Sequence, residues 1–179
     1  MLLIFPPALQ TPAPATQPPA DAGLPCDAKD HQALLIGDCT RDQILAHRAV
    51  FKERTDQAMP SEADRARWMA VKRPFTIVAA FGSWCSDSQH ELPSFLALDG
   101  QPNPFVEVQF IGVARDKVIE PSAWPAGIVA QKAEKVPTAW IFALGPGGTQ
   151  TLAGSVVEHP AKAGETFAES ILDVMEQAR

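Results

Sequence analysis

The chain has 179 residues, a formal net charge of −6 and no cluster of Lys and Arg. Its length fits one domain with an extension, and 46% hydrophobic with 20% charged residues is ordinary for a soluble globular protein. The acidic balance disfavours nucleic acid and anionic membranes as partners. No apolar run approaches the roughly 20 residues that a bilayer-crossing helix needs, so no membrane span is expected.

Residues 1–25 are rich in Pro, Ala, Thr and Gln and have little to bury, which predicts a disordered N-terminal segment. The opening stretch from Met1 to Phe5 is apolar, but it is short, lacks a basic flank and meets Pro6-Pro7. Two interpretations of this stretch stay open: the stub of a trimmed export signal, or a plain disordered start.

Two helix-capping signals follow along the chain. Thr40 to Gln43 reads as a capping box at the start of a helix, and Ser61 to Asp64 is a second capping signal before a helix that ends at Arg73-Pro74. We therefore expect a helical extension over residues 26–60 in front of a domain that spans residues 61–179.

The run from Phe75 to Phe81 is continuously apolar and has the length of a strand, which predicts a strand buried on both faces. A helix is expected from Ser86 to Leu98, interrupted at Pro93, because proline removes one helical hydrogen bond and bends the axis. Val106 to Val113 is rich in β-branched and aromatic residues and predicts the next strand.

The remaining segments predict a connector, a hairpin and a last helix. Residues 116–135 mix prolines with one short helical candidate at 127–134. Residues 138–142 and 149–157 flank a glycine-rich turn and predict a β-hairpin. The final helix is amphipathic, with Phe167, Ile171, Val174 and Met175 on one face. The order of elements predicts an α/β fold in which helices cover both faces of a central mixed sheet.

The segment Phe-Gly-Ser-Trp-Cys-Ser-Asp-Ser, residues 81–88, delivers Cys85 from a buried strand to the first turn of a helix. A helix N-terminus carries partial positive charge and unpaired N–H groups, and both favour thiolate over thiol. Ser88 stands where a second cysteine would complete Cys-x-x-Cys, and its hydroxyl can donate a hydrogen bond to the sulfur. The carboxylate of Asp87 acts in the opposite sense, because it repels a second negative charge.

From about residue 61 onwards the chain resembles the thioredoxin-like superfamily. Trp84-Cys85 follows a buried strand and opens a helix, and Pro93 interrupts that helix eight residues after the cysteine. Val136-Pro137-Thr138, just before a strand and a hairpin, resembles the cis-proline element of that family. The Gly-x-Trp-Cys-x-Asp-Ser form is similar to a set of bacterial thioredoxin-family proteins.

This resemblance implies a thioredoxin-like fold, with a central mixed β-sheet flanked by helices and a cis-proline loop beside the cysteine. It implies a catalytic pair, Cys85 and Ser88, and a substrate-binding group, Trp84, Val136, Pro137 and Thr138. The chain departs from the family at Ser88 and at Ala79, where thioredoxins carry a buried acid. These departures remove the attacking thiol and its base, so full dithiol turnover is not expected.

The expected activity is thiol–disulfide exchange of the monothiol type, with protein or glutathione thiols and disulfides as partners. The expected location is extracytoplasmic, in the periplasm of a bacterium, with the cytoplasm as the alternative. A redox-inactive peptide-binding or assembly module is the alternative function. A third hypothesis lets Cys26 or Cys39 resolve the mixed disulfide at Cys85.

Cys26 and Cys39 are also candidates for a disulfide with each other, which would leave Cys85 free. Closing a loop of this length stabilises a fold by roughly 3 kcal/mol in the chain-entropy model. In a cytosolic protein the same two residues are unrelated thiols. His31, His47 and His159 show no ligand spacing with one another or with the cysteines, so no metal and no cofactor are expected.

Overall fold

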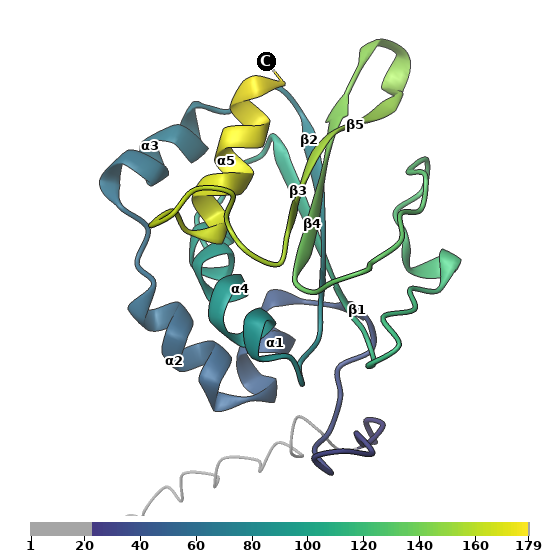
Figure 1. The fold of residues 1–179 in the computed structure, drawn as a ribbon. Helices are drawn as coiled ribbons and strands as arrows, with labels where there is room; N and C mark the ends of the chain where they lie inside the picture. Colours follow the sequence, from purple (N-terminus) through teal and green to yellow (C-terminus); the bar gives the residue numbers. More distant parts are fainter. Residues whose placement is uncertain (1–22, 179) are drawn as a thin grey trace, which may run out of the picture.

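The structure, a computed structural model, describes residues 23–178 (Figure 1). The predictions of disorder over residues 1–25 and of a trimmed export signal fall mainly on residues 1–22, which lie outside this range. Of the three described residues, 23–25, Leu24 packs against the larger core cluster. Within residues 23–178, no helix combines the length and the apolar character needed to cross a bilayer. The elements are, in chain order, β1 (Gly37–Cys39), α1 (Arg41–His47), α2 (Ala49–Gln57), α3 (Glu62–Ala70), β2 (Phe75–Phe81), α4 (Ser86–Asp99), β3 (Val106–Gly112), η1 (Pro121–Ala123), β4 (Thr138–Leu144), η2 (Pro146–Gly148), β5 (Gln150–Val157) and α5 (Phe167–Gln177).

Five strands form one mixed sheet in the order β1-β3-β2-β4-β5. The central strand, β2, is parallel to β3 and antiparallel to β4, and the edge strands β1 and β5 pair antiparallel with their neighbours. All seven residues of β2 are buried, which is why an unbroken apolar run predicts this strand. The predicted α/β class, the mixed sheet and the hairpin of β4 and β5 are confirmed.

The α-helices gather on one face of the sheet (Figure 1). The larger core cluster lies between these helices and the sheet, and its fully buried aromatic side chains are Phe51, Phe81, Phe95, Phe167 and, at 1% exposure, Trp68. The capping box at Thr40 and the cap at Ser61 are both present, which confirms the helix starts predicted from them.

The opposite face is covered by the connector between β3 and β4, so the prediction of helices on both faces is wrong (Figure 1). In this connector Trp124 packs against Trp140 of β4, with ring centroids 5.2 Å apart. The helix predicted over residues 127–134 does not form, and the connector's helical turn is η1 instead. Gly127 has a φ of +82°, a backbone conformation that a right-handed helix excludes.

Residues 26–60 belong to the same core as the rest of the described chain. β1, which no local pattern predicted, adds an edge strand next to β3, and Leu35, Ile44 and Phe51 enter the larger core cluster. A Cβ on Gly112 would lie 2.3 Å from the carbonyl oxygen of Leu35, so glycine is required for this close approach. The residues of the predicted extension and those of the predicted domain therefore share one hydrophobic core.

The predicted disulfide between Cys26 and Cys39 is not formed, and both are free thiols. Cys39 is buried on β1, where its thiol donates to the carbonyl oxygen of Gly37 at 3.3 Å. Burial raises the pKa of the Cys39 thiol. Cys26 is exposed in the segment before β1, where it forms an isolated bridge with Ala33. The two sulfurs are thus held by different parts of the fold.

Asp99, the last residue of α4, shows how burial of a carboxyl group affects the stability of the fold. Burial raises its pKa from 3.8 to about 6, although the positive charge of Arg41 acts in the opposite direction. The folded chain therefore binds this proton more tightly than the unfolded chain, and the contribution of Asp99 to stability is lost as the pH rises from 3.8 through about 6.

We expect Asp99→Asn to raise the free energy of unfolding at pH 7.5 by up to about 3 kcal/mol, because the neutral amide avoids ionisation in the buried position. The gain should shrink at about pH 4, where Asp99 of the folded protein is already neutral. Urea unfolding at the two pH values measures both effects. Asp56→Asn, on the exposed side of α2, is the control and should show no such gain. Equal effects of Asp99→Asn at both pH values would contradict the prediction.

Candidate functional site

Cys85 lies at the N-cap of α4, directly after β2 and a short loop. Its side chain is partly buried and free, and no side-chain hydrogen bond caps the helix here. The thiol donates a hydrogen bond to the carbonyl oxygen of Val136, with a sulfur–oxygen distance of 3.4 Å. The Val136–Pro137 peptide bond is cis, as predicted. The structure therefore brings the cysteine and the proline loop together from segments 51 residues apart.

Backbone and side-chain hydrogen bonds hold the proline loop in place. The Thr138 hydroxyl donates to the carbonyl oxygen of Lys135 at 2.8 Å, and the Glu158 N–H donates to the carbonyl oxygen of Pro137 at 2.6 Å. Val136 is 3% exposed and packs in the connector-side core. The segment that faces the sulfur is thus fixed by contacts with both the connector and the chain that follows β5.

Trp84 packs against the connector-side core and its indole N–H donates to the carbonyl oxygen of Val113 at 3.0 Å. On its ring lies the guanidinium of Arg115, 4.7 Å from the ring centroid. A Cβ on Gly82 would come within 2.8 Å of the Trp84 ring, so this loop position requires glycine. Trp84 is thus part of a core and directly precedes Cys85 in the chain.

Ser88 is fully buried, and its hydroxyl oxygen accepts a hydrogen bond from the Gly82 N–H at 3.1 Å. In this contact Ser88 acts as an acceptor, and the hydrogen bond from its hydroxyl to the Cys85 sulfur stays a prediction. Ser83 is buried as well and accepts from the Leu35 N–H at 3.3 Å. The two serines therefore hold the shape of the loop that presents Cys85.

Sequence reasoning missed Arg115 and Asp27, which form an ion pair beside the site. Nη2 of Arg115 lies 2.7 Å from Oδ2 of Asp27, whose side chain is only 2% exposed. The hydrogen bond with Arg115 holds the pKa of Asp27 below its usual value, and the same bond is the main cause that raises the pKa of Arg115. The charge of Cys85 is the smallest of the causes that raise the pKa of Arg115, after the hydrogen bond and the charges of Asp27 and Asp30.

One signal for Arg115 was present in the sequence. Arg115 follows the end of β3, and Cys85 follows the end of β2, which is parallel to it. The carboxyl ends of parallel strands meet at the same edge of a sheet, where ligands bind in open α/β folds. No local pattern marks Asp27, because it comes from a segment 88 residues away.

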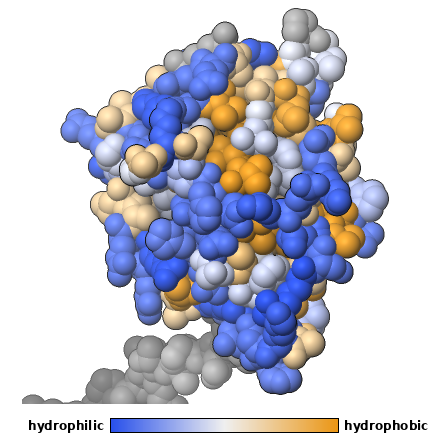
Figure 2. Space-filling view, in the orientation of Figure 1, coloured by the Kyte–Doolittle hydropathy of each residue, from blue (hydrophilic) through white to orange (hydrophobic). Residues whose placement is uncertain are grey.

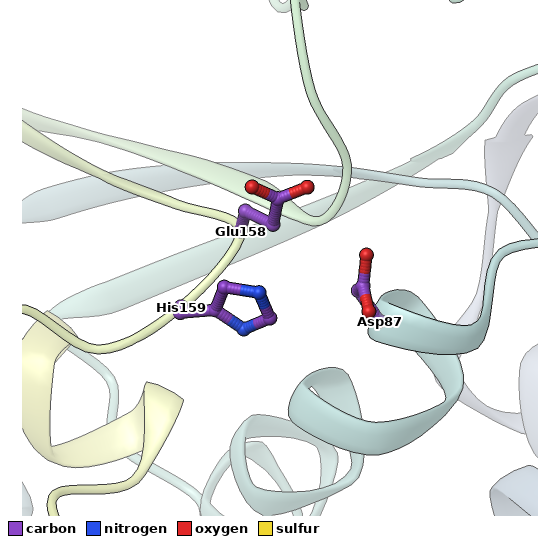
Figure 3. A group of neighbouring side chains, drawn as sticks. All are labelled: Asp87, Glu158 and His159. Atoms are coloured by element: carbon purple, nitrogen blue, oxygen red, sulfur yellow. The ribbon is translucent and has the colours of Figure 1, made fainter. Parts of the chain in front are cut away.

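A second group of polar side chains adjoins the proline loop, since the Glu158 N–H donates to the Pro137 carbonyl oxygen. Asp87 on α4 meets Glu158 and His159, which follow β5, and ligand atoms of all three lie within 4.8 Å of one another (Figure 3). The spacing of the histidines and cysteines in the sequence gives no sign of this group, because the neighbours of His159 in it are carboxylates and one of them comes from a distant segment. Glu158 also forms an ion pair with Lys135.

Hydropathy alone does not single out a binding surface. On the face shown in Figure 2, apolar side chains reach the surface among hydrophilic ones. Large exposed apolar side chains in the described range come from several segments, namely Ile36, Met59, Met69, Val118, Val129, Leu152 and Val157. The candidate site is thus located by Cys85 and its polar neighbours.

Two solved structures resemble this chain at low sequence identity. A protein of unknown function from Pseudomonas aeruginosa gives a TM-score of 0.51 at 19% identity, and the match covers 79% of this chain and 92% of that one. An HIV epitope scaffold gives a TM-score of 0.50 with the same identity and the same coverage of both chains. No protein-family model and no curated protein sequence matches this chain. The two likenesses show a shared fold and nothing about activity.

Replacing Arg115 tests its two effects, on stability and on the thiol. We expect Arg115→Gln to lower the urea midpoint at pH 7, because nearly buried Asp27 loses its charged partner. The loss should fade as the pH falls below 3.8, since Asp27 has a lowered pKa and stabilises the fold only where it is ionised. Alkylation of Cys85 by iodoacetamide should slow, because the cation that attracts the thiolate is gone.

Lys132→Gln is the matched control for Arg115→Gln. It removes the same charge from an exposed position of the same connector, where the side chain is 85% exposed. This variant should leave both the midpoint and the alkylation rate unchanged. Equal behaviour of the two variants would show that Arg115 acts only through net charge.

Proposed function

We propose that the chain is a thioredoxin-like protein that carries out thiol–disulfide exchange through a single reactive thiol, Cys85. The observation that carries the proposal is the partly buried sulfur at the N-cap of α4, 3.4 Å from the Val136 carbonyl oxygen in the cis-proline loop. The strand order, with parallel β2 and β3 followed by an antiparallel hairpin, supports a thioredoxin-like assignment of the fold.

The reaction needs two exchange steps. The Cys85 thiolate attacks one sulfur of a partner disulfide, which forms a mixed disulfide and releases the other partner sulfur as a thiolate. A second thiol, from glutathione or a protein, then attacks the mixed disulfide and releases Cys85 as a thiolate. Electrons thus pass from the second thiol to the disulfide, and Cys85 ends as it began.

The neighbourhood of Cys85 supports release by an external thiol. Ser88, one helical turn further on, carries a hydroxyl that cannot attack a disulfide at neutral pH. Ala79 is fully buried on β2 between Phe110 and Ala139, so its position supplies no acid or base. Cys39 is buried, whereas Cys26 is exposed and adjoins Asp27 of the Arg115 ion pair. Of the two remote thiols, Cys26 is therefore the candidate for an internal resolving role.

The redox-inactive binding module remains the second candidate, and one contact favours it. The Cys85 thiol donates its hydrogen to the Val136 carbonyl oxygen, so the sulfur already has a partner within the protein. In that case the loop around Pro137 binds a peptide without covalent chemistry. The reactivity of Cys85 separates the two candidates.

Incubation of the reduced protein with oxidised glutathione should attach one glutathione to Cys85, and excess dithiothreitol should remove it. Intact-mass spectrometry gives the number of attached glutathiones, and peptide mapping identifies the cysteine that carries each one. Cys26→Ser should keep the adduct and Cys85→Ser should lose it. An unmodified Cys85 would favour the binding module, and a disulfide between Cys85 and Cys26 would replace the monothiol mechanism with a dithiol one.

A second experiment restores the missing thiol. We expect Ser88→Cys to raise turnover severalfold in an insulin-reduction assay, because a thiol one turn along the helix lies within disulfide reach of Cys85. Ser88→Ala is the matched control, since it removes the hydrogen bond with the Gly82 N–H without adding a thiol. Equal turnover of the two variants would show that Cys85 forms no mixed disulfide that this position can resolve.

A further inference from the structure

Asp87, Glu158 and His159 form a compact group of metal-ligating side chains from two remote segments. Each of the three offers one ligand atom, and these atoms all lie within 4.8 Å of one another. Among residues 23–178 no other group of three or more His, Cys, Asp or Glu side chains meets this criterion. Asp87 comes from the first turn of α4, and the other two residues follow directly on the last residue of β5. Figure 3 shows the three side chains turned toward a common space.

The backbone explains why two successive residues share this space. Side chains of successive residues in a strand point to opposite faces. Glu158 interrupts that alternation with a φ of +61°. Its N–H is bound to the carbonyl oxygen of Pro137, and the His159 N–H donates to the carbonyl oxygen of Val157 at 2.7 Å. The turn at the end of β5 is thus fixed, and it directs both side chains toward α4.

The imidazole of His159 is oriented by a carboxylate outside the group. Its Nδ1 lies 3.3 Å from Oε1 of Glu91, which is four residues after Asp87 on α4. This contact leaves Nε2 as the nitrogen for a ligand bond. Histidines that bind metals commonly engage a carboxylate through the other ring nitrogen, which fixes the ring and raises its basicity.

The same place already attracts a cation of the protein. The ammonium of Lys135 forms an ion pair with Glu158, and the charge of Asp87 adds to this attraction. The Lys135 side chain is 59% exposed, so it can leave the group without opening a buried space. A divalent ion has twice the charge of the ammonium and is attracted by the same two carboxylates. The ammonium of Lys135 therefore competes with such an ion.

We propose that Asp87, Glu158 and His159 bind a divalent first-row transition cation, for which zinc is the probe. Zinc takes imidazole nitrogen and carboxylate oxygen at about 2.0 to 2.2 Å, so two donors on one ion lie at most about 4.4 Å apart. The observed spread of up to 4.8 Å needs only a small side-chain rotation, and His159 is 57% exposed. An imidazole ligand selects such ions over Mg²⁺, which prefers oxygen alone.

This site is separate from the thiol chemistry, although it borders it. Asp87 is two residues after Cys85, and Glu158 is bound to Pro137 through its N–H. The binding of a cation does not require that Cys85 be reactive. The two proposals can therefore fail independently, provided that metal binding is measured without the sulfur.

Isothermal titration with zinc chloride tests the site in a variant that carries Cys26→Ser and Cys85→Ser, so that the two accessible sulfurs cannot bind the ion. We expect one zinc per chain. His159→Gln should abolish this binding, and Glu91→Gln should weaken it by about 10- to 100-fold, as expected for loss of a residue that orients a ligand. Lys135→Met should tighten binding, because the competing ammonium is removed.

The matched control is His90→Gln, which removes an exposed histidine that also contacts Glu91 but lies outside the group. It should leave the zinc affinity within about twofold, and Mg²⁺ should give no saturable heat. Zinc binding that survives His159→Gln would overturn the proposal. The proposal would equally be overturned if neither the parent nor its Lys135→Met variant bound zinc.

Discussion

The complete burial of β2 is the constraint on which the rest of the structure depends. A strand with apolar side chains on both faces needs cover on both sides, and here the α-helices supply one cover and the connector supplies the other. The backbone hydrogen bonds of β2 also fix its neighbours in the sheet: β3 is parallel to β2, and β4 is antiparallel to it. Because β2 ends where β4 begins, Ala80 pairs with Thr138, and the residues after one strand meet those before the other.

This arrangement brings four distant segments to one edge of the sheet. Cys85 follows β2, Arg115 follows the parallel β3, and Pro137 precedes the antiparallel β4. Glu158 follows β5, whose last residue, Val157, pairs with the first residue of β4. Two ion pairs lie at this edge, Asp27 with Arg115 and Glu158 with Lys135, and Nδ1 of His159 lies 3.3 Å from Oε1 of Glu91. The sulfur of Cys85 contacts the Val136 carbonyl oxygen and follows a loop that buried serine hydroxyls keep in shape.

Local signals in the sequence predicted most of the elements, and long-range pairing decided the parts that were missed. The apolar run of β2 and the caps at Thr40 and Ser61 are complete within a few residues, so they could be recognised. β1 has three residues, and its pairing with β3 depends on Gly112, because any side chain there would collide with the backbone of Leu35. The Asp27–Arg115 pair and the carboxylate–histidine group have no local pattern, since their members meet only through the sheet.

The two proposals meet at the charge around Cys85. The guanidinium of Arg115 lies over the ring of Trp84, the residue before Cys85, and Asp87 is two residues after Cys85. The side chains of Arg115 and Asp87 carry charges of opposite sign. A divalent ion is the largest charge that such a site can hold, and it reverses the effect of its carboxylate ligands on neighbouring groups. A cation bound by Asp87, Glu158 and His159 would offset the negative charge two residues after Cys85, and this charge links the two proposed sites.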